Sequence, residues 1–410
     1  MERAEKTSCC VVGGGPGGMM LGLLLARQDV PVTVLEAHPT FERDFRGDTI
    51  HPGILEILDD IGLAERLHQL PHTKMYGPTF PSPSGPVMPI DFRMLLKSKY
   101  PYVLWVRQEL FLEFLAQEAS KFPSFKLVMG ANVEHLLMEQ KRVCGVSYRK
   151  GDRGHQIQAL LTVGADGRFS RLRKLGRFHV VQTSSPVELI WFHLPRLPGD
   201  PEGTGLVSPR FGKGKIMLMI DRADHWQVGY FIPVGTYPKV HAAGVEAMRR
   251  NIVDLEPRFA ENVKSLVDWH QFSLLSVASN RCTRWYKAGL LLIGDAAHTM
   301  TPAAGSGIKY AIEDAVVAAN VLVEPLKHKH VRLEDLAEVQ RRREWPTRVI
   351  QALGAFGLSR IGQALHSGQT LSAPGWLRKL FRCPIVPKLF ANMFAFGLWR
   401  VHVKDGGSRA

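Results

Sequence analysis

Residues 290–315 read LLLIGDAAHTMTPAAGSGIKYAIEDA, and this stretch decides the fold of the chain. The apolar run 290–293 predicts a buried strand that breaks at a glycine, so that Asp295 follows at its tip. After Pro302, a glycine-spaced loop leads into apolar periodicity over residues 308–323, which is typical of a helix. The stretch therefore predicts a strand, an acidic tip, a loop and a helix, in that order.

A glycine motif near the amino terminus carries a second nucleotide signature. Gly13, Gly15 and Gly18 form a GxGxxG pattern between a predicted strand and a predicted helix. This spacing permits a tight turn, lets backbone amides approach a pyrophosphate at the helix start and allows close helix packing. Glu36 ends the next predicted strand, at 32–35, where its carboxylate can accept hydrogen bonds from an adenosine ribose. Two signatures so far apart predict one dinucleotide held by both ends of the chain.

A third motif, GADGRFSRLR, occupies residues 164–173. Its Asp166 stands on a turn after a predicted strand, and Ser170 and a basic helix start follow. Taken alone, a DG turn is more often structural than functional. In combination with the other two motifs, it is also a candidate part of a nucleotide site.

The order and spacing of the three motifs resemble the group A flavoprotein monooxygenases, the para-hydroxybenzoate hydroxylase-like FAD-dependent hydroxylase family, as far as residue 320. The resemblance implies an α/β fold: a discontinuous, GR2-like Rossmann-type FAD-binding domain, an inserted antiparallel β-sheet substrate domain and a helical carboxyl-terminal tail. Alternating apolar residues over 187–233 predict that antiparallel sheet, and helical patterns are expected at 242–255, 259–269 and 333–353. The expected domains are residues 1–75, 100–183 and 272–330 for FAD, residues 76–99 and 184–271 for substrate, and residues 331–410 for the helical tail.

The resemblance also implies roles for individual residues toward FAD. The residues assigned to the ADP half are Gly13, Gly15, Gly18 and Glu36. Arg46 corresponds to the family arginine near the cofactor, and Gln108 to the glutamine at the start of a helix along the flavin chain. Asp166 corresponds to the aspartate associated with both FAD and the nicotinamide cofactor, and Asp295 to the one that binds the ribityl chain.

The loop beneath the flavin ring follows from the same resemblance. Its assigned residues are Pro302, Gly305, Gly307 and Ile308. A helix start there would offer amide donors and partial positive charge where negative charge accumulates on reduction. The chain departs from the family at Lys309, where an asparagine is common. Lys309 has two interpretations: it points to solvent or packs its stem, or its charge stabilises reduced flavin.

Substrate-facing residues are expected on the antiparallel sheet. Trp191, His193 and Tyr230 are speculative pocket residues, with His193 as a speculative base, although aromatic stripes in sheets more often form core. No catalytic residue is assigned beyond these. His298, close after Asp295, is expected to belong to a structural turn rather than to act as an acid or base.

Composition excludes several classes of protein. The 410 residues are 45% hydrophobic and 22% charged with a formal net charge of +14, which is typical of a globular chain with more than one domain. The excess of basic residues favours anionic ligands, but they are dispersed and resemble no nucleic-acid-binding module. The 5 cysteines lack metal-ligand spacing, so we expect no metal and a reducing, cytoplasmic compartment.

The carboxyl-terminal tail, residues 376–403, mixes large apolar and basic residues. It could lie on an anionic membrane surface as an amphipathic segment. Pro384, Pro387 and Gly397 interrupt it, which favours a packed terminal helix that caps the substrate domain. No apolar run of about 20 residues predicts a membrane-spanning helix.

Together these features predict an FAD-dependent monooxygenase that uses NADPH or NADH and O2. It would hydroxylate or epoxidise an electron-rich aromatic or unsaturated small molecule through a flavin C4a-hydroperoxide. Alternatives are an FAD-dependent reductase or dehydrogenase acting on a double bond, and a non-catalytic flavin-binding protein. The WxWxIP signature of halogenases is absent, because residues 228–233 read VGYFIP.

Overall fold

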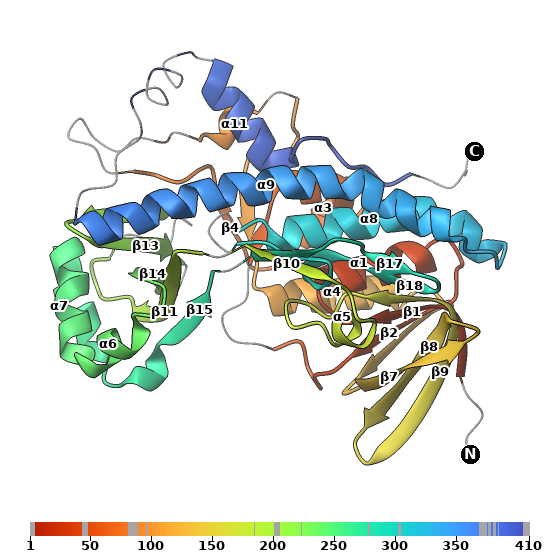
Figure 1. Cartoon of the computed structure of the whole chain (residues 1–410). Helices are drawn as coiled ribbons and strands as arrows, with labels where there is room; N and C mark the ends of the chain where they lie inside the picture. The colour runs from red at the N-terminus through yellow and green to blue at the C-terminus, as the bar shows by residue number, and fades with distance from the viewer. Residues whose placement is uncertain are drawn as a thin grey trace.

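A computed structural model describes residues 5–42, 48–80, 88, 90–95, 97–183, 185–200, 206–222, 224–277, 279–301, 305–368, 375, 379, 383 and 385–404. Arg46 and Pro302, both predicted to bind the cofactor, lie outside these residues. The chain forms a larger mixed sheet and a separate antiparallel sheet, with helices packed against both (Figure 1). The fold is therefore α/β.

The larger sheet has a parallel centre. Its strands, in spatial order, are β17 (Tyr286–Lys287), β18 (Leu290–Leu292), β9 (Arg153–Gly164), β1 (Glu5–Val12), β2 (Val32–Glu36) and β6 (Phe125–Met129), with β8 (Arg142–Lys150) and β7 (Asn132–Glu139) joined in turn to β9. Strands β18, β9, β1, β2 and β6 run parallel, whereas β17, β8 and β7 pair antiparallel. Strands β2 and β18 are buried along their whole length, and β1 is buried over its last four residues, as expected for parallel strands covered on both faces.

The register of three central strands aligns their carboxyl ends. Val12 of β1 pairs with Gly164 of β9, and Gly164 pairs with Leu292 of β18. The loops that follow these strands carry the three sequence motifs. In open α/β sheets, ligands bind in the crevice beyond the carboxyl ends of the strands.

Helices α1 (Pro16–Ala26) and α8 (Gly307–Lys327) follow two of these loops and pack against each other. Residues 17–26 of α1 are all buried, which explains why this helix is apolar on every side. The contact is close because Gly17 has no side chain: a Cβ there would lie 2.9 Å from the carbonyl oxygen of Ala311. The starts of the two helices are thereby fixed relative to one another.

The antiparallel sheet has the order β12 (Val207–Gly212), β13 (Lys215–Asp221), β14 (His225–Pro233), β11 (Val187–Pro195) and β15 (Ser273–Ser276). Helix α7 (Val245–Leu255) packs against one face, as Met248 and Ile252 join the apolar cluster there. Figure 1 places this sheet, with α6 (Tyr237–Ala242) and α7, beside the larger sheet. The prediction of an antiparallel sheet over 187–233 is confirmed.

The predicted helix at 259–269 is wrong. The segment forms short 3₁₀ turns instead, η2 (Pro257–Ala260), η3 (Asn262–Ser265) and η4 (Trp269–Gln271). The buried amide of Asn262 donates to the carbonyl oxygen of Pro195 at 2.9 Å, and the side chain of Gln271 accepts from the backbone of Val267 at 2.6 Å. Such side-chain bonds to backbone compete with the regular helical pattern.

Helix α9 (Leu333–Ser367) is longer than the predicted 333–353 and runs from the larger sheet to the antiparallel sheet (Figure 1). Near its start, Gln340 accepts a hydrogen bond from the backbone of Trp285 at 2.9 Å. Near its end, Leu358 and Leu365 pack with Val187 of the antiparallel sheet. One helix therefore ties the two sheets together.

The carboxyl-terminal helix α11 (Ile385–Phe396) packs on α2 (Pro52–Asp60), on η1 (Phe92–Met94) and on the small three-stranded sheet of β3 (Thr49–Ile50), β5 (Val103–Trp105) and β4 (Thr73–Met75). Ala391, Ala395 and Phe396 cluster with Phe92 and Val103. Within the described part of the chain, no helix has both the length and the apolarity needed to cross a membrane. The remaining elements are β10 (Val180–Thr183), β16 (Ser279–Cys282), β19 (His298–Thr299), α3 (Ala64–Leu67), α4 (Gln108–Ala119), α5 (Arg171–Leu175) and η5 (Gly294–Ala296).

Candidate cofactor-binding site

The glycine motif and the ADG turn are in direct contact. Gly13 has a φ of +110°, a conformation that side-chain-bearing residues rarely adopt. A Cβ at Gly13 would lie 2.4 Å from the carbonyl oxygen of Ala165, and a Cβ at Gly18 would lie 1.9 Å from the carbonyl oxygen of Gly13. The first and third glycines of the motif are thus required by the packing of the protein itself.

The second glycine is different. Gly15 is the N-cap of α1, and a Cβ built there meets nothing within 4 Å. Gly307 begins α8, and a Cβ built there also meets nothing within 4 Å. Each position lies at a helix start, where free N–H groups and the helix dipole favour an anion. Both positions therefore fit an anionic ligand group that approaches the backbone closely.

Glu36 is held at the end of β2 with its carboxylate oriented. The residue is 3% exposed, and its Oε2 accepts from the backbone N–H of Gly14 at 2.7 Å. Its Oε1 accepts from the backbone N–H of His38 at 2.9 Å and lies 2.8 Å from Nδ1 of the same histidine. The contact with His38 was not predicted. These contacts hold the carboxylate at the end of β2, beside the backbone of Gly14.

Asp166 serves the first turn of α5. Its carboxylate accepts from Ser170 Oγ at 2.5 Å and from the backbone N–H groups of Arg171 and Leu172 at 2.7 and 3.0 Å. Burial raises the pKa of Asp166, while these hydrogen bonds oppose the increase. The geometry supplies the structural role that a DG turn usually has. A role toward FAD or a nicotinamide cofactor stays a prediction.

A buried arginine joins the ADG turn to the Asp295 turn. Arg173 is 8% exposed, and its Nη1 donates to the carbonyl oxygens of Asp295 and Ala296, both at 3.3 Å. Its Nη2 donates to the carbonyl oxygen of Arg168 at 2.5 Å. The Asp295 side chain is 30% exposed, with one oxygen 4.0 Å from Nε of Arg168. The only sequence signal for this link is the place of Arg173 within the ADGRFSRLR motif.

Asp314 also holds the turn that carries Asp295. It is fully buried and accepts from the backbone N–H of Gly294 at 2.9 Å and from Nε of Arg343 at 2.7 Å. Nε2 of His298 lies 2.6 Å from Oδ2 of Asp314, which is the same oxygen that accepts from the backbone N–H of Gly294. Burial disfavours the charge, but His298 and Arg343 hold the pKa of Asp314 below its ordinary value. The structural interpretation of His298 agrees with this contact.

Lys309 is buried within the protein. It is 1% exposed, and its Nζ donates to the carbonyl oxygen of Phe394 in α11 at 3.1 Å. Burial lowers the pKa of Lys309 to about 8, against the attraction of Glu313. The expectation that its charge points to solvent is wrong, because α11 covers this side of α8; a packed stem agrees with the structure. An effect on reduced flavin stays a prediction.

The carbonyl oxygen of Gly305 is held by two side chains from one short segment. Oγ1 of Thr49 donates to it at 2.8 Å, and Nε2 of His51 lies 3.1 Å away. Burial lowers the pKa of His51 to about 3, and Lys309 adds to the decrease, so this histidine is neutral. These contacts, absent from the sequence prediction, fix the loop in front of α8.

The speculative substrate residues do not form one cluster. Trp191 lies opposite Gly229 in the register of β11 and β14, and its ring fills the space that a Cβ at Gly229 would need. His193 is exposed on the same face of the sheet and contacts His225, with ring centroids 4.4 Å apart. Tyr230 lies on the opposite face, buried in the cluster against α7. Tyr230 is therefore core and does not share a pocket with the other two.

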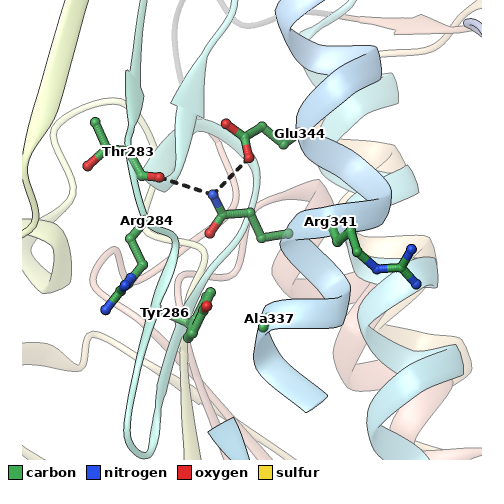
Figure 2. Close-up of a pocket in the computed structure, with 7 residues that line it drawn as sticks. Thr283, Arg284, Tyr286, Ala337, Arg341 and Glu344 are labelled. Carbon is green, nitrogen blue, oxygen red and sulfur yellow. Dashed lines mark hydrogen bonds between the residues drawn. The ribbon is translucent and has the colours of Figure 1, made fainter. Parts of the chain in front are cut away.

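One depression in the described structure lies away from these residues. It has a volume of about 350 Å³ and lies between residues 283–286 and α9 (Figure 2). Gln340 lines it and donates to the carbonyl oxygen of Thr283 and to Glu344, both at 3.1 Å. No predicted cofactor residue is among its lining residues.

Comparison with known proteins places this geometry in a family. Residues 6–352 match the family described as FAD binding domain. The chain is 31% identical over 342 residues to 6-methylpretetramide 4-monooxygenase of Streptomyces rimosus, covering 82% of this chain and 81% of that protein. It is 25% identical over 315 residues to the uncharacterized aromatic compound monooxygenase YhjG of Bacillus subtilis (strain 168), covering 76% of this chain but only 60% of that protein. The solved structure of OxyS anhydrotetracycline hydroxylase from Streptomyces rimosus has a TM-score of 0.74 at 20% identity, covering 98% of this chain and 78% of that chain.

Proposed function

The chain belongs to the group A flavoprotein monooxygenases, and we propose that it uses NADH or NADPH and O2 to hydroxylate or epoxidise an electron-rich aromatic or unsaturated small molecule. One observation carries the proposal. The paired register of β1, β9 and β18 brings two open helix starts, at Gly15 and Gly307, to one edge of the sheet. FAD matches that arrangement, because its pyrophosphate is anionic and its flavin ring takes up negative charge on reduction.

We assign the ADP half of FAD to the first helix start. Gly15 leaves the backbone N–H groups of α1 accessible to a pyrophosphate, since no atom lies within 4 Å of a Cβ built there. Glu36, oriented by Gly14 and His38, would accept from the ribose hydroxyls. Gly13 and Gly18 act indirectly, because they allow the tight turn that places the other two.

We assign the flavin half to the second helix start. Asp295 would accept from the ribityl chain, and the Gly305 to Ile308 segment would lie beneath the ring. The amino terminus of α8, a helix of 21 residues, would favour negative charge on the reduced ring. Thr49 and His51 hold the Gly305 carbonyl oxygen, which fixes this loop before the cofactor binds.

FAD, when bound at such a site, supplies the redox and oxygen chemistry, and the protein supplies binding, orientation and exclusion of water. Arg222, in the turn between β13 and β14 of the antiparallel sheet, pairs with Asp48. The neighbouring Thr49 donates to the carbonyl oxygen of Gly305, so this turn lies near the loop that we assign to the flavin. We therefore expect the substrate between that sheet and the loop at Gly305. The relatives named as aromatic compound and 6-methylpretetramide monooxygenases support an aromatic substrate class.

The test is purification of the full chain with bound FAD, followed by a panel of phenols, polycyclic aromatics and alkenes. The expected result is substrate-stimulated oxidation of NADH or NADPH that consumes O2 and is coupled to oxygenated product rather than to hydrogen peroxide. Substrate conversion without O2 would instead support a reductase or dehydrogenase. A protein that cannot be reconstituted with FAD would contradict the whole proposal.

A further inference from the structure

Arg222 stands where the two sheets meet. It lies in the turn between β13 and β14, is 8% exposed and forms an ion pair with Asp48. Its guanidinium carbon lies 4.6 Å from the ring centroid of Trp105, the last residue of β5. We call Asp48, Trp105 and Arg222 the Arg222 corner. Its members come from three segments that are distant in sequence.

The corner contains two buried N–H donors without a partner. Nη1 of Arg222 and Nε1 of Trp105 have no hydrogen-bond partner in the described structure, although Trp105 is only 9% exposed. Buried N–H groups are nearly always paired, because an unpaired one loses its bond to water without replacement. Two unpaired donors on stacked side chains therefore indicate an acceptor that the described residues do not supply.

Nη2 of the guanidinium and the backbone of Arg222 are held in place. Asp48 accepts from Nη2 of Arg222, and the backbone N–H of Arg222 donates to the carbonyl oxygen of His225 at 3.0 Å. Nε of Arg196 donates to the carbonyl oxygen of Arg222 at 2.9 Å. The other charged groups of the turn are engaged: Arg196 pairs with Asp221, and His225 Nδ1 lies 2.7 Å from Asp224. The two unpaired donors thus belong to side chains that the protein already holds in place.

The corner also adjoins the proposed flavin loop. The backbone N–H of Gln108, the first residue of α4, donates to Oδ1 of Asp48 at 3.4 Å. The next residue, Thr49, donates to the carbonyl oxygen of Gly305 at 2.8 Å. A ligand held by Arg222 would therefore lie close to the loop that we place beneath the flavin ring.

We propose that Arg222 and Trp105 bind the oxygen of a phenolate or enolate substrate, so that they select substrates with an ionisable oxygen; this inference rests on the proposed function. The Arg222–Asp48 pair has no net charge, so its free N–H suits one oxygen with a single or partial negative charge better than a phosphate group. Hydrogen bonds to the ionised form favour ionisation. An ionised oxygen makes the conjugated ring richer in electrons, which suits oxygen transfer to that ring.

The experiment measures binding rather than turnover. Oxidised, FAD-loaded protein is titrated with 7-hydroxycoumarin and 1,8-dihydroxyanthraquinone, each against its O-methyl ether, by difference absorption spectroscopy. The same sample reports FAD content by its flavin absorbance, so failure of the proposed function shows as absent flavin. The variants are Arg222→Met, which removes the donors, and Trp105→Phe, which removes one N–H but keeps the aromatic face. Arg258→Met is the matched control, because Arg258 also stacks on a tryptophan, 4.7 Å from the ring of Trp226, and pairs with Glu256.

The expected result is that at least one hydroxylated probe binds and shows the phenolate spectrum at a lower pH than in free solution. Arg222→Met should weaken its binding by about 10- to 100-fold, and Trp105→Phe by roughly 3- to 10-fold, as for loss of a charged and a neutral hydrogen bond. FAD content should stay the same in both. The methyl ethers should bind more weakly and respond less to the substitutions.

Other outcomes would overturn the inference. Equal binding of hydroxylated and methylated probes, or binding of neither, would exclude selection of an ionisable oxygen. Weaker binding of NADPH with unchanged binding of the probes would assign the corner to the nicotinamide cofactor instead. If Arg222→Met does not fold, Trp105→Phe decides, and an unchanged affinity of the hydroxylated probes in that variant contradicts the inference.

Discussion

Nζ of Lys309 in the first turn of α8 donates to the carbonyl oxygen of Phe394 in the last turn of α11, at 3.1 Å. The negative end of a helix dipole favours a cation, and the burial of Lys309 strengthens the contact. The carboxyl-terminal helix is thereby joined to the helix start that we assign to the flavin ring.

Lys309→Met should loosen α11. Methionine keeps the length of the stem but removes one donor to the partly buried carbonyl oxygen of Phe394, which costs at most about 1–3 kcal/mol. We expect a lower midpoint of thermal unfolding and faster hydrogen exchange over residues 385–396. The control is Lys388→Met, which changes an exposed lysine of the same helix. Unchanged exchange over α11 would contradict the role of this contact.

The same lysine predicts a dependence of stability on pH. Its pKa is lowered from 10.5 to about 8 in the folded state, chiefly by burial. Between these values the unfolded chain binds more protons than the folded one, so the free energy of unfolding rises with pH, by at most roughly 1.4 kcal/mol per pH unit. The wild type should therefore gain stability relative to Lys309→Met between pH 8 and 10.5 in chemical denaturation. A constant difference across that window would show that the lysine is not titrated there.

Much of the site was predictable from short motifs. The GxGxxG spacing, the ADG turn and the GD turn each predict a strand followed by a loop, and parallel strands in one sheet bring such loops to a common edge. The motifs at Gly13, Asp166 and Asp295 thus predict that three loops meet at the carboxyl edge of one parallel sheet, as the register of β1, β9 and β18 shows. The buried strands and the antiparallel sheet also followed from apolar periodicity.

The errors come from contacts that no local pattern carries. The sequence does not say whether Tyr230 shares a face with Trp191, because the face of a residue in a hairpin depends on register, and Trp191 pairs with Gly229. The sequence leaves open whether Lys309 points to solvent or packs its stem, because nothing near it in sequence indicates that Phe394 covers it. No sequence pattern predicts the role of Arg222, since its partner Asp48 is distant in sequence.

Asp314→Asn should impair both stability and FAD binding. The substitution removes one of the two buried carboxylates that pair with Arg343, the other being that of Glu313, and weakens the acceptor for the backbone N–H of Gly294, which positions the Asp295 turn. Breaking a buried ion pair from one side typically costs about 3–5 kcal/mol when the remaining charge has no partner, so we expect a smaller cost while Glu313 still pairs with Arg343. Thermal unfolding and flavin content of the purified protein measure the two effects. Glu338→Gln, which breaks surface ion pairs on α9, should change neither by much; equal effects of the two variants would argue against a special role for Asp314.

The glycines of the first motif predict separable effects on folding and on cofactor binding. Gly13→Ala should destabilise the protein even without FAD, because a Cβ there meets the carbonyl oxygen of Ala165 at 2.4 Å and the φ of +110° is strained for alanine. Gly15→Val should leave the stability of the FAD-free protein nearly unchanged, since a built Cβ meets nothing within 4 Å and the φ of −74° is ordinary.

In Gly15→Val, however, the added side chain occupies the space that we assign to the pyrophosphate. Its affinity for FAD should fall at least about 10-fold, as expected when backbone donors at a helix start are blocked. Titration of the FAD-free proteins with FAD, followed by flavin fluorescence, measures the affinity, and chemical denaturation in the absence of FAD measures the stability. If Gly15→Val binds FAD as tightly as the wild type, the pyrophosphate does not lie at the start of α1, and the placement of the whole cofactor along the sheet edge is wrong.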